Sequence, residues 1–375
     1  MNLIIRRLIA FLLLISASAL LISPLGKEKD VTVFATQKNE DVTCSLKDCE
    51  SEIKVKSRLI ELLFGKKEDE EPIMLIPGGA IFGAKIKQSY VSVQNPGEIK
   101  DLKPGDKIIS LNGRKISSVG DVKEFIESLD EKSITLVCER GGKEVTVKIT
   151  PKKQDGEYKL GLILKDGAAG IGTITYIDPK TGAFGGLGHG ICDTDTGEVI
   201  KLSNGQVCGV ILSGVKKGEN GRPGELSGLL TDKVSGDIYT NTEYGLFGRL
   251  DKIPDMINAT PIKIAHREDV HEGDATILST VKAGGTKEYK IKILDIDKNS
   301  TETKSFKIKV TDPTLIAITG GVVRGMSGSP IIQDGKLVGA VTHVMVADPT
   351  EGYGIFIENM LNASQTTRNE LPKAA

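Results

Sequence analysis

The pattern of hydrophobic and polar residues divides the chain into four stretches. Residues 8–25 contain no charged side chain, and a polar stretch follows them. Within residues 74–153, apolar runs alternate with turn dipeptides around one segment, 119–129, whose apolar residues recur at helical spacing. From residue 160 onward, short apolar runs alternate with turns, and a helical pattern returns only at 356–361. The pattern predicts a mainly β protein, in which a small α/β domain is followed by a β-barrel or a pair of barrels.

The N-terminal segment, residues 1–28, is predicted to be an export signal. Arg6 and Arg7 precede the uncharged run, and that run is long enough to cross the hydrocarbon core of a membrane, which favours a retained signal anchor. A signal peptide cut near Ala17 or Ala19 is the alternative. The positive-inside rule keeps both arginines in the cytoplasm, so we expect the rest of the chain on the far side of the membrane.

Composition narrows the functional classes. The chain has 375 residues, enough for two domains, and its 43 glycines and lack of tryptophan suit many short strands joined by tight turns. The formal net charge of -1 gives no general attraction to nucleic acid. Residues 29–73, with a charge run at 66–71, are predicted to be a linker. The five cysteines lack Cys-x-x-Cys spacing, so we expect neither a metal site nor a cofactor.

Residues 74–153 are predicted to form one small domain. The glycine-rich apolar run 75–86 is followed by the segment 102–113, in which turn sequences flank an apolar strand. These residues resemble the PDZ domains of bacterial proteases. The resemblance implies that a peptide adds a strand to an edge of the sheet while loop amides hold its terminal carboxylate. By analogy, that loop consists of Gly78, Gly79, Ala80, Ile81 and Phe82. A spacer, or an internal clamp on the catalytic domain, is the alternative.

The sequence Gly-Met-Ser-Gly-Ser-Pro at residues 325–330 is the strongest chemical signal in the chain. A serine hydroxyl becomes a nucleophile when a base takes its proton and donors stabilise the oxyanion, and both require an exposed loop with small neighbours. The segment resembles the nucleophile loop of chymotrypsin-like peptidases, which implies that Ser327 is the nucleophile and that the backbone amides of Gly325 and Ser327 are the oxyanion donors. Because a strand follows, it is not the elbow of an α/β-hydrolase.

The choice of a general base is narrow, because the chain has only four histidines. His189 is the candidate, since it lies in a glycine-rich segment that leaves its ring accessible and precedes the serine by a long interval. His343 is interpreted as a strand residue or a pocket wall. His266 and His271 are assigned to a solvated polar loop, because they lack the spacing of a zinc-binding helix.

The third member of such a site is a carboxylate that holds the imidazole tautomer. Asp193 and Asp195 lie near the histidine in sequence but have the pattern of a solvent-exposed turn, whereas Asp312 precedes the serine by 15 residues at the end of a strand. Spacing alone does not decide between them. A Cys192 nucleophile is the enzymatic runner-up, and its position three residues after His189 is poor geometry for mutual reach.

Several motifs together resemble the stage IV sporulation protein B peptidases of spore-forming bacteria. These motifs are Gly170-Ile-Gly-Thr, Gly186-Leu-Gly-His, Gly325-Met-Ser-Gly-Ser-Pro, Val341-Thr-His-Val and Asp348-Pro-Thr-Glu-Gly-Tyr-Gly. The resemblance covers nearly the whole length, including the membrane segment and the PDZ module. It implies a trypsin-like peptidase domain with two β-barrels at 160–375 and a triad of His189, Asp312 and Ser327.

The family resemblance also implies a biological role. It implies a serine endopeptidase that is exported into the space between forespore and mother-cell membranes, and that cleaves itself and the regulators of an intramembrane protease in sporulation signalling. The expected partners are protein substrates, a peptide for the PDZ domain and the membrane, but not nucleic acid. The competing hypothesis is a catalytically silent, membrane-tethered PDZ scaffold in spore or envelope assembly.

Overall fold

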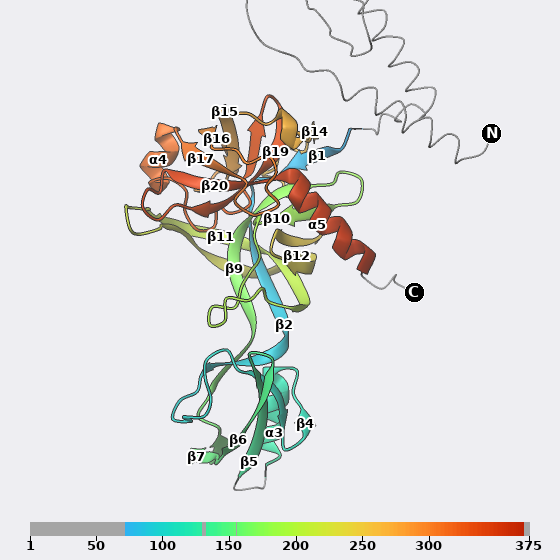
Figure 1. The fold of residues 1–375 in the computed structure, drawn as a ribbon, viewed down its shortest axis with the longest axis vertical. Helices are drawn as coiled ribbons and strands as arrows, with labels where there is room; N and C mark the ends of the chain where they lie inside the picture. The colour runs from blue at the N-terminus through green and yellow to red at the C-terminus, as the bar shows by residue number, and fades with distance from the viewer. Residues whose placement is uncertain (1–71, 130–132, 155, 371–375) are drawn as a thin grey trace, which may run out of the picture. The chain divides into compact units, whose positions relative to one another are not determined.

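The computed structural model describes residues 72–129, 133–154 and 156–370. The expected membrane segment at 1–28 lies outside these residues, as does all but the end of the linker predicted at 29–73. Within the described ranges, no helix has both the length and the apolar character needed to span a membrane. Figure 1 shows the order of the elements along the chain.

The first barrel is a ring of six antiparallel strands in the order β9-β10-β13-β12-β11-β2, closed by pairing between β2 and β9. Its core is apolar, and the rings of Phe82 and Phe184 pack edge to face at 5.8 Å. Short strands β1 and β14 extend the sheet beyond β9. The strands are β1 (Met74–Pro77), β2 (Ile81–Asn95), β9 (Ile163–Ile177), β10 (Ala183–Gly186), β11 (Leu202–Lys216), β12 (Glu225–Thr242), β13 (Gly245–Leu250) and β14 (Ile262–Lys263).

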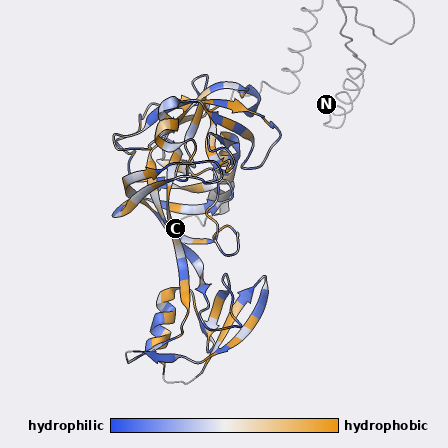
Figure 2. Cartoon of the chain, turned by 90° about the vertical axis from the view of Figure 1, so that its left-hand side faces the viewer, coloured by the Kyte–Doolittle hydropathy of each residue, from blue (hydrophilic) through white to orange (hydrophobic). Residues whose placement is uncertain are grey.

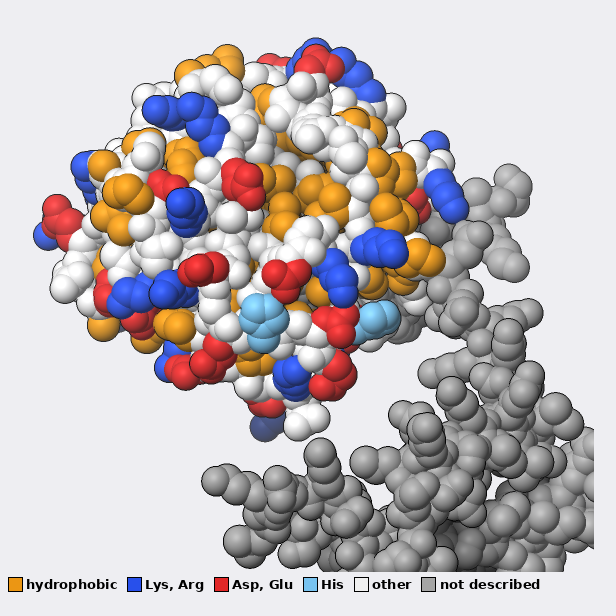
Figure 3. Space-filling model, turned by 90° about the horizontal axis from the view of Figure 1, so that it is seen from above, with side chains coloured by type: hydrophobic (Ala, Val, Ile, Leu, Met, Phe, Trp, Pro, Cys, Tyr) orange, Lys and Arg blue, Asp and Glu red, His pale blue; other side chains and the backbone are white. Residues whose placement is uncertain are grey.

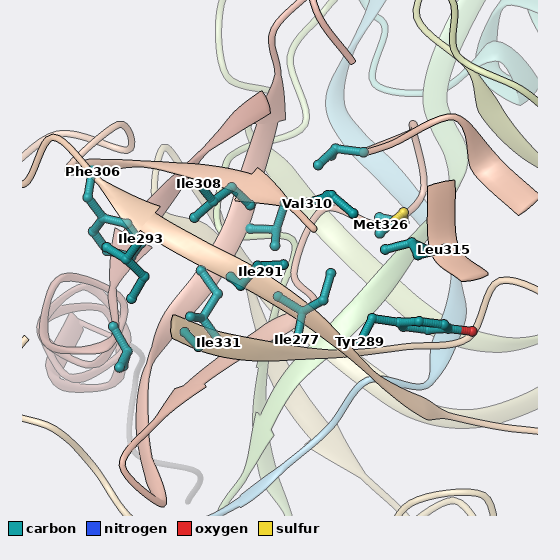
Figure 4. Packing of buried hydrophobic residues seen from close by; sticks show 14 of the residues in the cluster. Ile277, Tyr289, Ile291, Ile293, Phe306, Ile308, Val310, Leu315, Met326 and Ile331 are labelled. Atoms are coloured by element: carbon teal, nitrogen blue, oxygen red, sulfur yellow. The ribbon is translucent and has the colours of Figure 1, made fainter. Parts of the chain in front are cut away.

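The second barrel is closed by strands in the order β15-β16-β17-β20-β19-β18. Alternation sets the inward face: in β16, Tyr289, Ile291 and Ile293 are buried between exposed lysines and a glutamate, and Figure 4 shows these side chains packed inside the barrel. The elements are β15 (Gly273–Ser279), β16 (Lys287–Leu294), β17 (Phe306–Val310), α4 (Pro313–Thr319), β18 (Pro330–Gln333), β19 (Lys336–Val344), β20 (Glu351–Phe356) and α5 (Ile357–Glu370), with a 3₁₀ turn, η1 (Arg267–Asp269), before β15.

A third core belongs to a small α/β domain, in which α3 packs against a strand layer (Figure 2). Ser118 and Asp121 form a capping box that starts α3, where the helical spacing predicted it. The buried carboxylate of Asp106 accepts two hydrogen bonds from Arg140, at 2.6 and 2.7 Å. The elements are β3 (Lys107–Leu111), β4 (Arg114–Lys115), α3 (Val119–Glu127), β5 (Ile134–Arg140), β6 (Lys143–Ile149), β7 (Lys152–Gln154) and β8 (Glu157–Lys159).

The small domain is an insertion in the first barrel, and this corrects the predicted boundaries. We expected it at 74–153, ahead of a catalytic domain at 160–375. The structure instead places residues 74–87 in the barrel, because the first half of β2 pairs with β9 on one side and β11 on the other. The chain leaves the barrel through β2 and returns through β9 (Figure 1).

The charge distribution agrees with a net charge close to zero. On the face shown in Figure 3, acidic and basic side chains are interspersed with apolar ones. A mixed surface of this kind creates no long-range field of one sign.

Candidate active site

Ser327 lies in the loop between α4 and β18, and two tight turns shape this loop. The amide of Met326 donates to Val323 and that of Ser329 donates to Met326. Gly325 and Gly328 have φ angles of 97° and 95°, a region that side chains with a Cβ rarely adopt. A Cβ on Gly328 would lie 2.1 Å from the carbonyl oxygen of Thr173 and 2.5 Å from the amide nitrogen of Leu187. Only glycine fits there, which explains the residue after the serine.

Strand β9 of the first barrel holds this loop of the second barrel in place. The Thr173 hydroxyl donates to the Gly325 carbonyl and the Thr175 hydroxyl to the Gly328 carbonyl, both at 2.8 Å. The amide of Thr173 donates to the Ser327 carbonyl at 3.0 Å. Both threonines are fully buried, so these bonds are shielded from water. The loop that carries Ser327 belongs to the second barrel, but the first barrel therefore holds it in place.

His189 lies at the same junction, three residues after β10. The chain reaches it through Leu187 and Gly188, both with a φ of 69°. The backbone of Leu187 abuts Gly328, and a Cβ on Gly188 would lie 3.0 Å from Thr342 of β19. The Ser327 hydroxyl also contacts Thr342, so the structure brings the predicted nucleophile and base to one place.

The hydrogen bond of His189 fixes its tautomer. Its Nδ1 lies 2.9 Å from the carbonyl oxygen of Gly190, and because a carbonyl only accepts, Nδ1 must carry the proton. Burial lowers the pKa of His189, and the hydrogen bond to Gly190 raises it by less. The pKa therefore lies below its ordinary value. The ring is therefore neutral at pH 7, with Nε2 free to accept a proton. This is the state that a general base requires.

The Ser327 hydroxyl donates to the Thr342 carbonyl at 2.8 Å and makes no hydrogen bond to His189 in this structure. The two amides expected to bind the oxyanion, those of Gly325 and Ser327, donate no hydrogen bond within the described residues. Donors that the protein leaves unused on an ordered loop are available to a substrate. Catalysis from this arrangement requires the serine hydroxyl to turn from Thr342 toward the imidazole.

Asp312, the carboxylate implied by the family resemblance, is not brought together with His189. It is the N-cap of α4, where its Oδ1 accepts from the amides of Thr314 at 2.9 Å and Leu315 at 3.0 Å. No carboxylate contributes to the shifted pKa of His189. An aspartate before a proline at a helix start is a strong capping sequence, and this explains the position. In this structure the Gly190 carbonyl takes the orienting role.

The two alternative carboxylates also lie elsewhere. Asp193 and Asp195 form an ion-pair cluster with Lys165, in a short hairpin that follows the histidine. The predicted turn is confirmed, but Asp193 is buried and not solvent-exposed. The sequence alone did not predict the burial of Asp193, because its partner, Lys165, is 28 residues away.

A second imidazole accompanies the candidate base. The ring centroid of His343 is 5.0 Å from that of His189. Burial, with smaller contributions from His189 and Lys304, lowers the pKa of His343 to about 4. Its buried Nδ1 has no hydrogen-bond partner within the described residues. His343 lies in β19, as predicted for a strand residue, and its role as a pocket wall stays a prediction.

The remaining candidate residues have ordinary environments. His271 bonds Asp334 at 2.9 Å in an exposed turn, as predicted for a polar loop. Cys138 is buried, and burial raises its pKa to about 11, while Cys192 is exposed. Within residues 72–129, 133–154 and 156–370, no cluster of His, Cys, Asp and Glu side chains is placed to hold a metal ion.

The predicted peptide-binding loop, Gly78, Gly79, Ala80, Ile81 and Phe82, requires correction. The first three of these residues form the turn from β1 to β2 in the first barrel, and Ile81 and Phe82 are the first two residues of β2. The amides of Gly78 and Gly79 already donate to Thr175 and Ile174 of β9, at 2.9 and 2.8 Å. Because these donors are used, the loop cannot hold a carboxylate with them. Local similarity of glycine-rich apolar runs misled the assignment.

The structure offers a different groove in the inserted domain, between α3 and the start of β9. The amides of residues 160–162 donate no hydrogen bond within the described part of the chain, and beyond them residues 163–165 pair with β2 along one edge only. A free strand edge next to unused loop amides and an apolar helix face suits an extended chain terminus. The groove holds about 300 Å³ and is lined by Val122, Ile126, Lys152, Gln154, Tyr158, Lys159, Leu160, Gly161, Leu162 and Leu164. The signal in the sequence was Leu160-Gly161-Leu162, an apolar-glycine-apolar sequence opening a strand.

Comparisons with known proteins agree with this organisation. A PDZ domain model matches residues 89–140, and a model described as SpoIVB peptidase S55 matches residues 156–361, more than half of the chain. "Probable protease eep" of Enterococcus faecalis is 34% identical over 26% of this chain and 21% of its own length. Serine protease HTRA1 of Xenopus laevis is 34% identical over 26% and 20%. The chain thus covers about a fifth of each of these curated relatives.

Among solved structures, the active form of the Rv3671c protease from M. tuberculosis aligns at 15% identity, over 56% of this chain and 77% of that chain, with a TM-score of 0.32. The inactive form aligns at 13% identity over 52% and 83%, with a TM-score of 0.31.

Two β-barrels that meet at a serine and a histidine, with a PDZ domain inserted in the first, define a chymotrypsin-like peptidase fold. The match over residues 156–361 then identifies the branch: the chain belongs to the SpoIVB peptidase S55 family.

Proposed function

We propose that the protein is a serine endopeptidase in which Ser327 is the nucleophile and His189 the general base. The observation that carries the proposal is the state of His189: it is partly buried and neutral, its Nδ1 proton is held by the Gly190 carbonyl, and it lies beside a nucleophile loop with two unused amides. These are the groups that acyl transfer requires.

The chemistry follows from these positions. The Ser327 hydroxyl leaves Thr342 and attacks the scissile carbonyl carbon while its proton moves to Nε2 of His189. The amides of Gly325 and Ser327 stabilise the oxyanion of the tetrahedral intermediate. His189 returns the proton to the departing amine, and water, activated by the same imidazole, then hydrolyses the acyl-enzyme. Asp312 as the third member of a triad stays a prediction of the resemblance.

The biological setting is a further part of the proposal. The family name supports a role in sporulation, and the N-terminal sequence supports export with membrane anchoring or release, into the space between forespore and mother-cell membranes. The proposed substrates are regulators of an intramembrane protease, together with the chain itself. The PDZ groove would recruit a peptide terminus.

The deciding experiment is fluorophosphonate labelling of the purified chain, with self-cleavage followed on a gel. We expect labelling in the wild type and its loss in Ser327→Ala and His189→Ala. Ser203→Ala and His271→Ala, which alter exposed residues outside the junction, are the matched controls and should label normally. A folded wild type without labelling would favour the silent PDZ scaffold instead.

A further inference from the structure

The segment that follows His189 forms a short hairpin against the inserted PDZ domain. A β-bridge between Cys192 and Val199 closes the hairpin. At its tip, the side chain of Asp193 is only 2% exposed and Nζ of Lys165 lies 3.2 Å from its carboxylate. Lys165, whose side chain is 16% exposed, also pairs with Asp195. An ion pair this well shielded from solvent is screened less than a surface pair.

Two further contacts join the hairpin to the PDZ domain. Nζ of Lys107 in β3 bonds Glu198 at 2.7 Å. Gly105, at the turn before β3, lies so close to the hairpin that a Cβ there would be 2.6 Å from the Thr196 methyl group. Burial lowers the pKa of Lys165, but hydrogen bonds and charge attraction from Asp195 and Asp193 together raise it by more. The pKa of Lys165 therefore lies above its ordinary value. The pair is therefore charged at neutral pH.

The base of the same hairpin is tied directly beside His189. The side-chain amide of Asn241 in β12 accepts from the amide of Ile191 and donates to the carbonyls of Ile191 and Ile200, at 2.8 to 3.0 Å. The amide of Gly190, whose carbonyl orients the imidazole, donates to Glu243 at 3.1 Å. The carbonyl that orients His189 therefore lies at the base of the hairpin whose turn contacts the PDZ domain, and one short segment connects the two.

The tip is also connected to the peptide groove. Lys165 lies in β9 directly after Leu164, which lines the groove, and alternation along the strand sends the two side chains to opposite faces. A peptide that pairs with the free edge of residues 163–165 would bond the backbone of the strand that carries Lys165. Peptide pairing at this edge and the ion pair of Lys165 would therefore share the backbone of one short strand segment.

We propose that Lys165 is a positioning residue that couples occupation of the PDZ groove to the placement of His189, so that an extended chain terminus with apolar side chains and a free carboxylate activates the peptidase. The proposal rests on the function proposed above. Activation is the expected direction, because the Ser327 hydroxyl bonds Thr342 in this structure, and the placement of the imidazole decides whether the hydroxyl reaches it after turning from Thr342.

The test uses the full chain and a pool of octapeptides with randomised sequences, free carboxylates and Val, Leu or Ile at the last position. The same pool with amidated termini is the control. We measure the rate constant of fluorophosphonate labelling, kcat and KM for a fluorescent casein, and peptide binding by fluorescence anisotropy. In the wild type, the free-acid pool should raise the labelling rate and kcat about fivefold or more, with little change in KM, and the amidated pool should not.

The variants separate coupling from structure. Lys165→Met should bind the peptides as the wild type does and yet show no rate increase, while Lys165→Arg should restore the response. Lys307→Met, which removes a lysine paired with Asp295 in the second barrel, is the matched control and should respond normally. An equal response in wild type and Lys165→Met, or no response of an active wild type to the free-acid pool, overturns the proposal. A wild type that never labels counts against the proposed function itself.

Discussion

Asp312 offers the sharpest test of the structure, because helix capping and catalysis make different demands on its side chain. As the N-cap of α4 it uses Oδ1 as the acceptor, which Asn also provides, while its Oδ2 accepts a longer bond of 3.3 Å from the amide of Lys290. Loss of the cap in Asp312→Ala leaves the amides of Thr314 and Leu315 without their side-chain acceptor. We therefore expect Asp312→Ala to lower the free energy of unfolding by about 1 kcal/mol, and Asp312→Asn by only a few tenths.

Thermal unfolding followed by circular dichroism measures this difference. About 1 kcal/mol corresponds to a fall in Tm of roughly 2–4 °C for a domain of this size. Asp232→Ala is the matched control, because this aspartate is exposed and pairs with Lys85 at the surface, a class of ion pair that contributes about 0–1 kcal/mol. Equal destabilisation by Asp312→Asn and Asp312→Ala would refute the capping role.

Activity of the same variants decides the catalytic role. Replacing the carboxylate of a Ser-His-Asp triad by an amide costs roughly 10⁴ in kcat. A loss of that size in Asp312→Asn, at unchanged stability, would identify Asp312 as the third member, brought to His189 by a rearrangement of the loop around α4. Retained activity would show that capping is its whole role and that the Gly190 carbonyl suffices to orient the imidazole.

Three further outcomes follow from the geometry. Gly328→Ala should abolish labelling and lower Tm, because its Cβ would lie 2.1 Å from a β9 carbonyl at a φ of 95°; unaltered labelling would contradict the tight docking of the loop. A pH profile of kcat/KM should show activity falling with decreasing pH along an apparent pKa below 6.5, because the lowered pKa of His189 keeps the imidazole neutral above that range. Since the unfolded chain binds a proton at this histidine more readily than the folded one, the free energy of unfolding should also decrease as pH falls from 6.5 toward the folded pKa. Arg140→Met should destabilise the PDZ domain by about 2 kcal/mol in urea unfolding, because the buried Asp106 loses its charged partner.

The parts of the site that sequence predicted are those determined by local chemistry. Ser327 and His189 stand in glycine-rich segments, and close backbone approach is the reason for those glycines: a Cβ on Gly328 or Gly188 would meet the opposite barrel or β19. The predicted helix at 119–129 is confirmed as α3 for the same reason, since spacing and a capping box are local signals. The mainly β class also follows from composition and turn spacing.

The parts that sequence did not predict depend on long-range pairing. The run 75–86 has the pattern of a PDZ start, and only its pairing with residues 168–173 of β9 and with β11 shows that it belongs to the barrel. The buried pair of Lys165 with Asp193 is equally nonlocal. Asp312 is ambiguous for a different reason, because an aspartate before proline satisfies a helix start as well as a triad.

A single strand links the two functional regions of this fold. β9 is a 15-residue strand whose first residues form the free edge beside the PDZ groove, and whose Thr173 and Thr175 hold the nucleophile loop. From Lys165 to Thr173 the strand covers roughly 26 Å, at about 3.3 Å per residue. The insertion of the PDZ domain between β2 and β9 creates this connection, because a domain placed ahead of the barrel would share no strand with it. The groove is therefore connected to Ser327 through β9 and to His189 through Lys165 and the hairpin at Asp193, so the proposed nucleophile and the proposed base are both linked to the proposed peptide site.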